Sequence, residues 1–299
     1  MITVSNVSKG YSKKPAVSNL SFTVNPGEIH GLIGENSAGK TTIIKCMTGI
    51  YKPDDGSITL DGKDVFDNMD AKKRIAYIAD APAFVPFYTV KQVVKMYKSL
   101  YEKFSIDRFS KYNEIFKIPM KSVAMSLSKG QKMRLQIMLE LSKGAEYIIM
   151  DEPSSGLDPV ARNQFFELVV KEVEENSTGI FISSHNLDGL EKICDTVTVL
   201  NHGRIENNMT IDDAKSSFYK INAVFEKGAP DELYKIPEII DIKNTGRIYS
   251  MVTKMPENEI KEILTSLGAG FSETLDLSLE EYFIALDLYY KNEDDSKSE

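Results

Sequence analysis

Short apolar runs, each about the length of a strand, occur along the first 80 residues of the chain. Some alternate with polar residues, while the run just before residue 34 is mostly apolar, as in a strand that is buried on both faces. Pro26 and Gly27 mark a turn before that run. We interpret as strands residues 2–4, 20–24, 28–33, 57–60 and 74–79.

From residue 89 the spacing of apolar residues becomes helical. One helical face carries Val90, Val93, Val94, Tyr97, Leu100 and Tyr101. The helical pattern extends to about residue 142, and strand patterns return at residues 146–152, 179–184 and 196–200. Strands that alternate with helices predict an α/β domain over residues 1–215, and the inserted helices predict a helical subdomain at about residues 86–143.

Beyond residue 215 the strand and helix patterns are shorter, which predicts a small α+β domain at residues 216–290. Strand patterns lie at residues 221–225 and 239–253, and helical patterns at 257–267 and 278–289. This part has no metal-ligand spacing and no nucleophile constellation, so we expect it to regulate the first domain or support its dimerisation. Residues 291–299 are acidic, and we expect a disordered tail there.

Charge is distributed unevenly between the two predicted domains. Residues 216–299 contain 9 Lys and Arg against 17 Asp and Glu, whereas residues 1–215 contain 27 of each sign. The basic stripe of a nucleic-acid binder is absent, so no nucleic-acid partner is expected. There is no apolar run of about 18–20 residues and no signal-peptide pattern, so we expect a cytoplasmic protein. Cys46 and Cys194 lie in apolar patterns, which favours buried free thiols over a disulfide.

The most specific motif spans residues 34–42, Gly-Glu-Asn-Ser-Ala-Gly-Lys-Thr-Thr, and fits the phosphate-binding pattern G-x-x-x-x-G-K-[ST]. It lies between a predicted strand and a predicted helix, a context that a Gly-rich turn with an ordinary lysine does not require. Backbone N–H groups in such a loop bind phosphate oxygens, the lysine adds a cation, and the first threonine is a Mg²⁺ ligand. The predicted nucleotide-binding residues here are Gly34, Asn36, Ser37, Ala38, Gly39, Lys40, Thr41 and Thr42.

Carboxylates follow the strand at residues 146–152. Asp151 is predicted to hold Mg²⁺ together with Thr41, and Glu152 to polarise the attacking water as general base. His185 directly follows the strand at residues 179–184, at the sheet edge where ligands bind, which favours contact with the γ-phosphate. Tyr11, which we place in a polar loop, is a candidate for stacking on a base, although a loop tyrosine is more often ordinary surface.

At residues 127–131, Leu-Ser-Lys-Gly-Gln resembles the LSGGQ signature of ATP-binding cassette (ABC) ATPases. With the phosphate loop, Asp151, Glu152 and His185 in the family's order, the resemblance covers residues 1–215. It implies the ABC cassette fold, a mixed sheet with a helical subdomain. It also implies that two cassettes pack head to tail around ATP. By the resemblance, Ser128, Gly130 and Gln131 would contact the γ-phosphate of the ATP held by the other cassette. Residues 155–158, which include Asp158, would form the D-loop, and Tyr11 would stack on the adenine.

This sequence departs from the family pattern at four positions. Asp80 stands where the family usually has a glutamine that contacts Mg²⁺, so it is a candidate metal and nucleotide contact with an anionic side chain. Ser37 replaces a common glycine, Glu35 a common proline, and Lys129 the second signature glycine. We still expect hydrolysis because Lys40, Asp151, Glu152 and His185 are all present.

The resemblance predicts an ATPase subunit that drives a separate transmembrane subunit, attached through it to the inner face of the membrane. It pairs with a second cassette, identical or not, and residues after 215 loosely resemble the extension of bacterial exporters of peptides, drugs or lipids. Residues 83–88 carry aromatics that suit a helix of the partner, or that form subdomain core. The alternatives are a soluble ABC ATPase outside transport and a nucleotide-gated scaffold with weak hydrolysis, which Asp80 and Ser37 favour.

Overall fold

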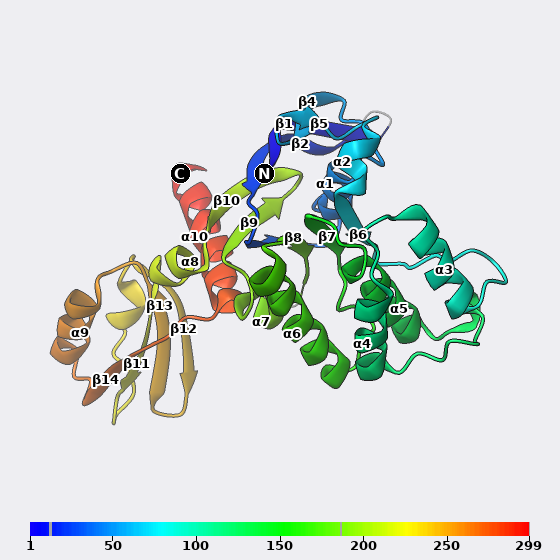
Figure 1. Cartoon of the computed structure of the whole chain (residues 1–299). Coiled ribbons are helices and arrows are strands. Elements are labelled where there is room, and N and C mark those ends of the chain that lie inside the picture. The colour runs from blue at the N-terminus through cyan, green and yellow to red at the C-terminus, as the bar shows by residue number, and fades with distance from the viewer. Residues whose placement is uncertain (12–13, 186, 299) are drawn as a thin grey trace. The chain divides into compact units, whose positions relative to one another are not determined.

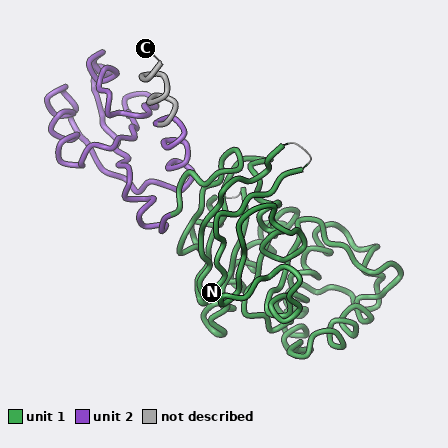
Figure 2. The backbone as a smooth tube through the Cα atoms, turned by 90° about the horizontal axis from the view of Figure 1, so that it is seen from above, with its two compact units in different colours: residues 1–208 green, residues 209–299 purple. Residues whose placement is uncertain are grey.

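The computed structural model describes residues 1–11, 14–185 and 187–298, and for residues 290–298 only the backbone. The chain divides into two compact units, residues 1–208 and 209–299 (Figure 2). The division lies seven residues before the expected boundary at 215. The reason is helix α8 (Ile211–Ser216), whose N-terminus is capped by Thr210 and which belongs to the second unit.

Within the described residues of the first unit, six strands form the sheet that positions the site. Their order is β10-β9-β3-β8-β7-β6, and the pairs β3–β8, β3–β9, β7–β8 and β6–β7 are parallel (Figure 1). The strands are β3 (Ile29–Ile33), β6 (Ile75–Ile78), β7 (Tyr147–Asp151), β8 (Gly179–Ser183), β9 (Thr196–Asn201) and β10 (Arg204–Thr210). Since parallel strands end at one edge, the segments that follow β3, β6, β7 and β8 are brought together there.

A second sheet packs over helix α1 (Lys40–Met47) and has the order β2-β1-β4-β5. Its strands are β1 (Ile2–Tyr11), β2 (Lys14–Val24), β4 (Asp55–Leu60) and β5 (Lys63–Asp64). The placement of Tyr11 in a loop was wrong, because β1 continues to that residue. Register shifts after Val4, Val7 and Lys9 break the alternation of side chains, so the sequence pattern ends too early.

The inserted segment of the first unit is helical, as the periodicity predicts. Its elements are α3 (Val90–Leu100), α4 (Ile106–Phe116), a 3-10 turn (Ala124–Ser126) and α5 (Lys129–Leu141), which lie beyond β6 (Figure 1). The unit also contains α2 (Met69–Lys73), which the sequence analysis missed, α6 (Pro159–Asn176) and α7 (Leu187–Glu191). Cys46 and Cys194 are buried and free, and burial raises the pKa of both thiols, that of Cys46 to about 11.

The described part of the second unit contains an antiparallel sheet of order β12-β13-β11-β14. The strands are β11 (Tyr219–Val224), β12 (Ile239–Thr245), β13 (Ile248–Thr253) and β14 (Phe271–Leu275), with a 3-10 turn (Leu233–Lys235), α9 (Glu257–Ser266) and α10 (Leu279–Ser298). Helix α10 corrects the expected disordered tail, since its backbone is helical through residue 298. No Gly or Pro interrupts residues 279–298.

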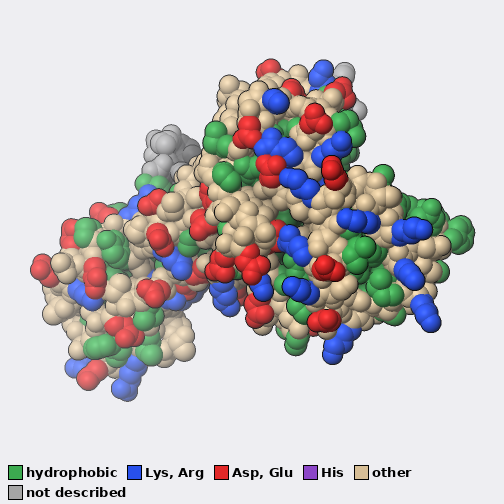
Figure 3. All heavy atoms as spheres, viewed as in Figure 1, with side chains coloured by type: hydrophobic (Ala, Val, Ile, Leu, Met, Phe, Trp, Pro, Cys, Tyr) green, Lys and Arg blue, Asp and Glu red, His purple; other side chains and the backbone are tan. Residues whose placement is uncertain are grey.

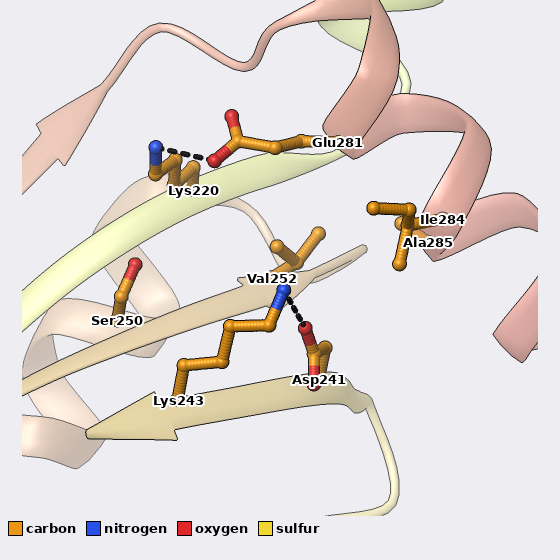
Figure 4. Close-up of a pocket in the computed structure, with 8 residues that line it drawn as sticks. All are labelled: Lys220, Asp241, Lys243, Ser250, Val252, Glu281, Ile284 and Ala285. Carbon is orange, nitrogen blue, oxygen red and sulfur yellow. Dashed lines mark hydrogen bonds and ion pairs between the residues drawn. The ribbon is translucent and has the colours of Figure 1, made fainter.

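The charges beneath the first turns of α10 are paired. Lys220 on β11 donates to Glu281 at 2.6 Å, and Lys243 lies 3.2 Å from Asp241 on β12 (Figure 4). The cavity between them measures about 20 Å³, the size of roughly one water molecule. The opposite charges at this contact between the sheet and α10 therefore neutralise one another. In the described portion of the chain, no helix is long and apolar enough to cross a membrane.

Candidate functional site

The phosphate loop connects β3 to α1, and its two motif glycines are required by close backbone approaches. A Cβ atom on Gly34 would lie 2.3 Å from the carbonyl oxygen of Leu200. Gly39 has φ of +109°, and a Cβ there would lie 2.6 Å from the carbonyl oxygen of Ala16. Ser37 has φ of 69° in the left-handed region, which costs a non-glycine residue about 1 kcal/mol. The glycine common in the family at that position would adopt it without this strain.

Lys40 is held across the loop with its ammonium group directed back over the backbone. Its Nζ donates to the carbonyl oxygens of Gly34 at 2.6 Å and Glu35 at 3.2 Å, and lies 3.9 Å from Oε1 of Glu152. Among the described residues no side chain caps the N-terminus of α1. The first turn of this helix therefore offers N–H groups and a positive dipole end beside a buried cation, an arrangement that binds phosphate.

A cavity of about 380 Å³ opens at this edge of the sheet. The described residues that line it are Tyr11, Ala16, Glu35, Asn36, Ser37, Gly39, Lys40, Thr41, Thr42, Asp80, Asp151 and Glu152. Tyr11 is half exposed at the end of β1, with its hydroxyl 3.3 Å from Oγ1 of Thr42. Ala16 and Glu35 were not assigned to the site from the sequence. Neither residue type carries a signal for phosphate binding, and the fold brings Ala16 to the cavity from β2 and Glu35 from the phosphate loop.

The carboxylates after β7 are anchored to β8. Asp151 is buried and its Oδ1 accepts from Oγ of Ser183 at 2.8 Å. The backbone N–H of Glu152 lies 3.2 Å from the carbonyl oxygen of Ser183 and 3.1 Å from its hydroxyl. Glu152 itself has φ of 49°. Ser183 was missed by the sequence analysis; a serine at the end of an otherwise apolar strand is the signal that would have identified it.

Glu152 and His185 form a pair at the mouth of the site. Oε2 of Glu152 lies 2.7 Å from Nδ1 of His185 and 3.3 Å from the backbone N–H of the same residue. The carboxylate is only partly exposed, whereas the histidine is largely exposed. Two contacts from one residue fix the direction of the carboxylate, which leaves its second oxygen toward Lys40. The predicted contact of His185 with the γ-phosphate stays a prediction: the histidine contacts Glu152 and is not among the described residues that line the cavity.

The oxygen donors predicted to hold a metal ion line the same cavity. They are the hydroxyl of Thr41 and the carboxylates of Asp80 and Asp151. The described residues contain no group of three His, Cys, Asp or Glu side chains that would hold a metal alone. Oxygen donors supplemented by water and phosphate oxygens suit Mg²⁺. Burial raises the pKa of Tyr77 to about 12, and the nearby Asp151 and Asp80 carboxylates add to the rise.

The signature segment lies at the N-terminus of α5. Ser128 caps the helix: its hydroxyl accepts from the N–H of Gln131 at 3.3 Å, and the side chain of Gln131 accepts from the N–H of Ser128 at 3.1 Å. Lys129 donates to the hydroxyl of Ser155 at 3.4 Å. A Cβ on Gly130 would lie 2.8 Å from the carbonyl oxygen of Gly156. The signature is therefore packed against residues 155–158 of its own chain.

Asp158 has structural contacts within the chain. Its Oδ1 accepts from the N–H of Ala161 at 2.9 Å as the N-cap of α6, and its other oxygen pairs with Arg134. The backbone hydrogen bond from Ala161, followed by Arg134, lowers the pKa of this carboxyl group. The described residues that line the cavity do not include seven of the predicted site residues: Gly34, Ala38, Ser128, Gly130, Gln131, Asp158 and His185.

Comparison with known proteins agrees with this geometry. A family model described as ABC transporter matches residues 17–155. The Bacillus subtilis ABC transporter ATP-binding protein YtrB is 30% identical over 285 residues, which cover 95% of this chain and 97% of that protein. The SkfA peptide export ATP-binding protein SkfE of the same organism is 31% identical, over 71% of this chain and 90% of SkfE.

Another relative is named for import, whereas SkfE is named for export. The ribose import ATP-binding protein RbsA of Bacillus cereus is 29% identical over 92% of this chain, which spans 59% of the length of that protein. A solved ATP-binding subunit of an ABC transporter has a TM-score of 0.67 at 27% identity, covering 72% of this chain and 92% of its own. A structure of cbiO1 from Clostridium perfringens, part of the ABC transporter complex cbiONQ, has a TM-score of 0.60 at 26% identity, over 71% and 89%. The ABC cassette fold, the phosphate loop and these relatives lead to one conclusion. The chain belongs to the ATP-binding subunits of ABC transporters, a family of ATPases coupled to transport.

Proposed function

We propose that this chain binds ATP with Mg²⁺ in the cavity at the phosphate loop and hydrolyses it with Glu152 as general base. The observation that carries the proposal is the convergence of Lys40, Asp151 and Glu152 on one cavity, with the direction of Glu152 fixed by His185. A carboxylate oriented by a neighbouring donor is suited to accept a proton from an attacking water. The lysine and the N-terminus of α1 supply positive charge where phosphate charge develops.

The roles of the other residues follow from their positions. Thr41, Asp151 and Asp80 would hold Mg²⁺, which when bound neutralises charge on the phosphate oxygens. Ser183 keeps Asp151 in place by a hydrogen bond of 2.8 Å. Tyr11 presents a half-exposed ring at the rim of the cavity, where a base would stack. Asn36, Ser37 and Thr42 line the phosphate side.

We propose that a second cassette completes the site. The signature residues Ser128, Gly130 and Gln131 belong to an exposed or half-buried helix N-terminus that does not line the cavity of its own chain. A helix N-terminus of this kind fits the phosphate of ATP held by a partner cassette. The partner is a second copy of this chain or a related subunit. Hydrolysis would then remove the bridging phosphate and let the two cassettes separate.

The surface for the transmembrane partner is proposed at residues 83–88. Phe87 is 88% exposed and has φ of 64°, while Phe84 is half-buried. Figure 3 shows hydrophobic side chains gathered at the outer end of the helical subdomain, around α3 and the segment before it. The exposed aromatic supports the binding of a partner helix over the alternative of subdomain core. Through this partner the chain would be held at the inner face of the membrane.

Export of a peptide, drug or lipid is the direction we propose. The peptide-export relative is matched over 90% of its length, whereas the ribose-import relative is matched over 59%. The experiment is affinity purification of the tagged chain from detergent-solubilised membranes of its own cell. A stoichiometric polytopic subunit supports the transporter assignment, and its cavity would reveal the class of substrate. Recovery of soluble proteins or ribosomes alone would contradict it.

A further inference from the structure

The outer edge of strand β6 is covered by one helix. This strand ends the six-stranded sheet, and β7 is its neighbour on the inner side (Figure 1). In an extended strand the backbone groups of alternate residues point to the same side, so those of residues 75, 77 and 79 share the outer edge. Helix α5 lies along this edge. Asp80, which lines the phosphate cavity, directly follows residue 79.

Polar side chains of α5 and of the turn that follows it bond to these edge groups in sequence. Gln136 matches Ala79 on both sides: with its amide oriented to suit both partners, its nitrogen donates to the carbonyl oxygen at 3.0 Å and its oxygen accepts from the N–H at 2.9 Å. Glu140 accepts from the N–H of Tyr77 at 3.3 Å. Lys143 donates to the carbonyl oxygen of Ile75 at 2.7 Å. Gln136 and Glu140 are four residues apart and lie on one face of α5, and Lys143 follows in the turn after the helix.

The lower part of this ladder is buried. Glu140 and Lys143 are nearly inaccessible to solvent and lie 3.9 Å apart, and Glu140 also accepts from the hydroxyl of Tyr97 at 2.8 Å. Burial raises the pKa of Glu140 and lowers that of Lys143, and each charge opposes the effect on the other. Buried backbone groups that lose such partners are left with unsatisfied polar atoms, which destabilises the folded chain. The helix and the strand edge are therefore joined as one body.

Gln136 bonds to Ala79, the residue directly before Asp80 of the phosphate cavity. The carbonyl group of Ala79 and the N–H of Asp80 belong to one rigid peptide plane. An amide that holds both the N–H and the carbonyl of Ala79 therefore sets the orientation of that plane and the direction in which Asp80 leaves the strand. The signature residue Ser128 caps the same helix eight residues earlier, about 12 Å along its axis. A displacement of the signature is thus transmitted to residue 80 through a stiff helix.

We propose that Gln136 is a positioning residue that sets Asp80 in the phosphate cavity and couples its position to that of the signature helix. The inference rests on the proposed role of Asp80 at the cavity. Gln136 has no contact with nucleotide in this arrangement and acts through the backbone of residue 79. Gln136 is not among the described residues that line the cavity, so the cavity alone does not indicate this positioning role.

The first test uses the nucleotide-free protein. Q136M removes the amide at similar volume and should make the amide hydrogen of Ala79 exchange about tenfold faster, the equivalent of one lost hydrogen bond. The matched control is S142A, which removes a hydroxyl at the C-cap of α5 that has no hydrogen-bond partner among the described residues. Unchanged exchange at Ala79 in Q136M would overturn the proposal.

The second test is a double-mutant cycle on ATP hydrolysis with Q136M and D80A. If Gln136 acts through Asp80, Q136M lowers kcat about tenfold in the wild-type background and causes no further loss in D80A. S142A should match the wild type. An equal loss from Q136M in both backgrounds would show a general structural effect and overturn the inference while leaving the proposed function intact. A D80A protein as active as the wild type would contradict the proposed role of Asp80 and, with it, this coupling.

Discussion

Oε2 of Glu152 lies 2.7 Å from Nδ1 of His185, and this contact joins the ends of two neighbouring strands. The histidine follows β8 and the glutamate follows β7, so neither is positioned by its own strand alone. A side chain that orients a general base affects the chemical step more than nucleotide binding. The contact therefore predicts a separation between kcat and ATP affinity.

His185→Ala should lower kcat by about 10²-fold while the affinity for ATP changes little, because the loss of orientation misplaces the carboxylate. Steady-state hydrolysis and binding of a fluorescent ATP analogue measure the two quantities. His202→Ala is the control, since that residue follows β9 in the turn to β10 and does not line the cavity. A His185→Ala protein with normal kcat would show that Glu152 does not depend on this contact.

Ser37→Gly should stabilise the phosphate loop. The left-handed conformation of Ser37 costs the folded state about 1 kcal/mol, and glycine removes this cost. Glycine also makes the unfolded chain more flexible, which lowers the free energy of unfolding by about 0.5–1 kcal/mol. We expect the free energy of unfolding to stay equal or rise slightly. Ser57→Gly in β4, where the backbone is extended, should instead lower it. Urea denaturation compares the two, and a Ser37→Gly protein as destabilised as Ser57→Gly would contradict the strain.

His30 should make the first unit sensitive to acid. It is buried beside the stacked rings of Phe22 and Phe181, with Nε2 2.8 Å from Oγ1 of Thr198. Burial lowers its pKa to about 4, although Glu28 opposes the shift. Between pH 6.5 and 4, His30 binds a proton in the unfolded chain but stays neutral in the folded chain. The contribution of His30 is therefore complete above pH 6.5 and is lost as the pH falls, by about 3 kcal/mol.

His30→Gln removes this titration, so its unfolding free energy should fall less steeply with acid over that pH range than that of the wild type. His202→Gln serves as the exposed comparison at a turn. The measurement is denaturant unfolding at several pH values. Parallel curves for the wild type and His30→Gln would exclude the buried histidine as the source of acid sensitivity.

Phe87→Ala should weaken assembly with the transmembrane subunit without changing the stability of the chain, because the side chain is 88% exposed. Leu100→Ala at the end of α3 is the matched control, since Leu100 is also an exposed apolar residue, at 62%, outside residues 83–88. Co-purification from solubilised membranes measures assembly. Equal recovery with both variants would place the partner surface elsewhere.

The sequence could predict that the candidate site residues meet at one sheet edge because the signals that mark them are local. The phosphate loop, Asp151 and Glu152, and His185 each follow a short buried run, and parallel strands bring such ends together without further information. The fold was less predictable where contacts between distant segments decide it. Bulges in β1 hide the strand that carries Tyr11. The place of Ser183 at the end of an apolar strand is a local signal, but its partner Asp151 lies on another strand, and no local pattern reports that Gln136 bonds Ala79. The end of α10 was missed because acidic composition suggests disorder even without a helix breaker.

We propose above that Glu152 serves as the base for ATP hydrolysis in this cavity. Steady-state hydrolysis of ATP by the wild type and by Glu152→Gln, with the binding of ATP measured on both, tests this role directly. We expect Glu152→Gln to bind ATP as the wild type does, to lose hydrolysis by about 10²-fold or more, and to accumulate as an ATP-bound dimer. Equal rates in the two proteins, whether high or at background, would contradict it.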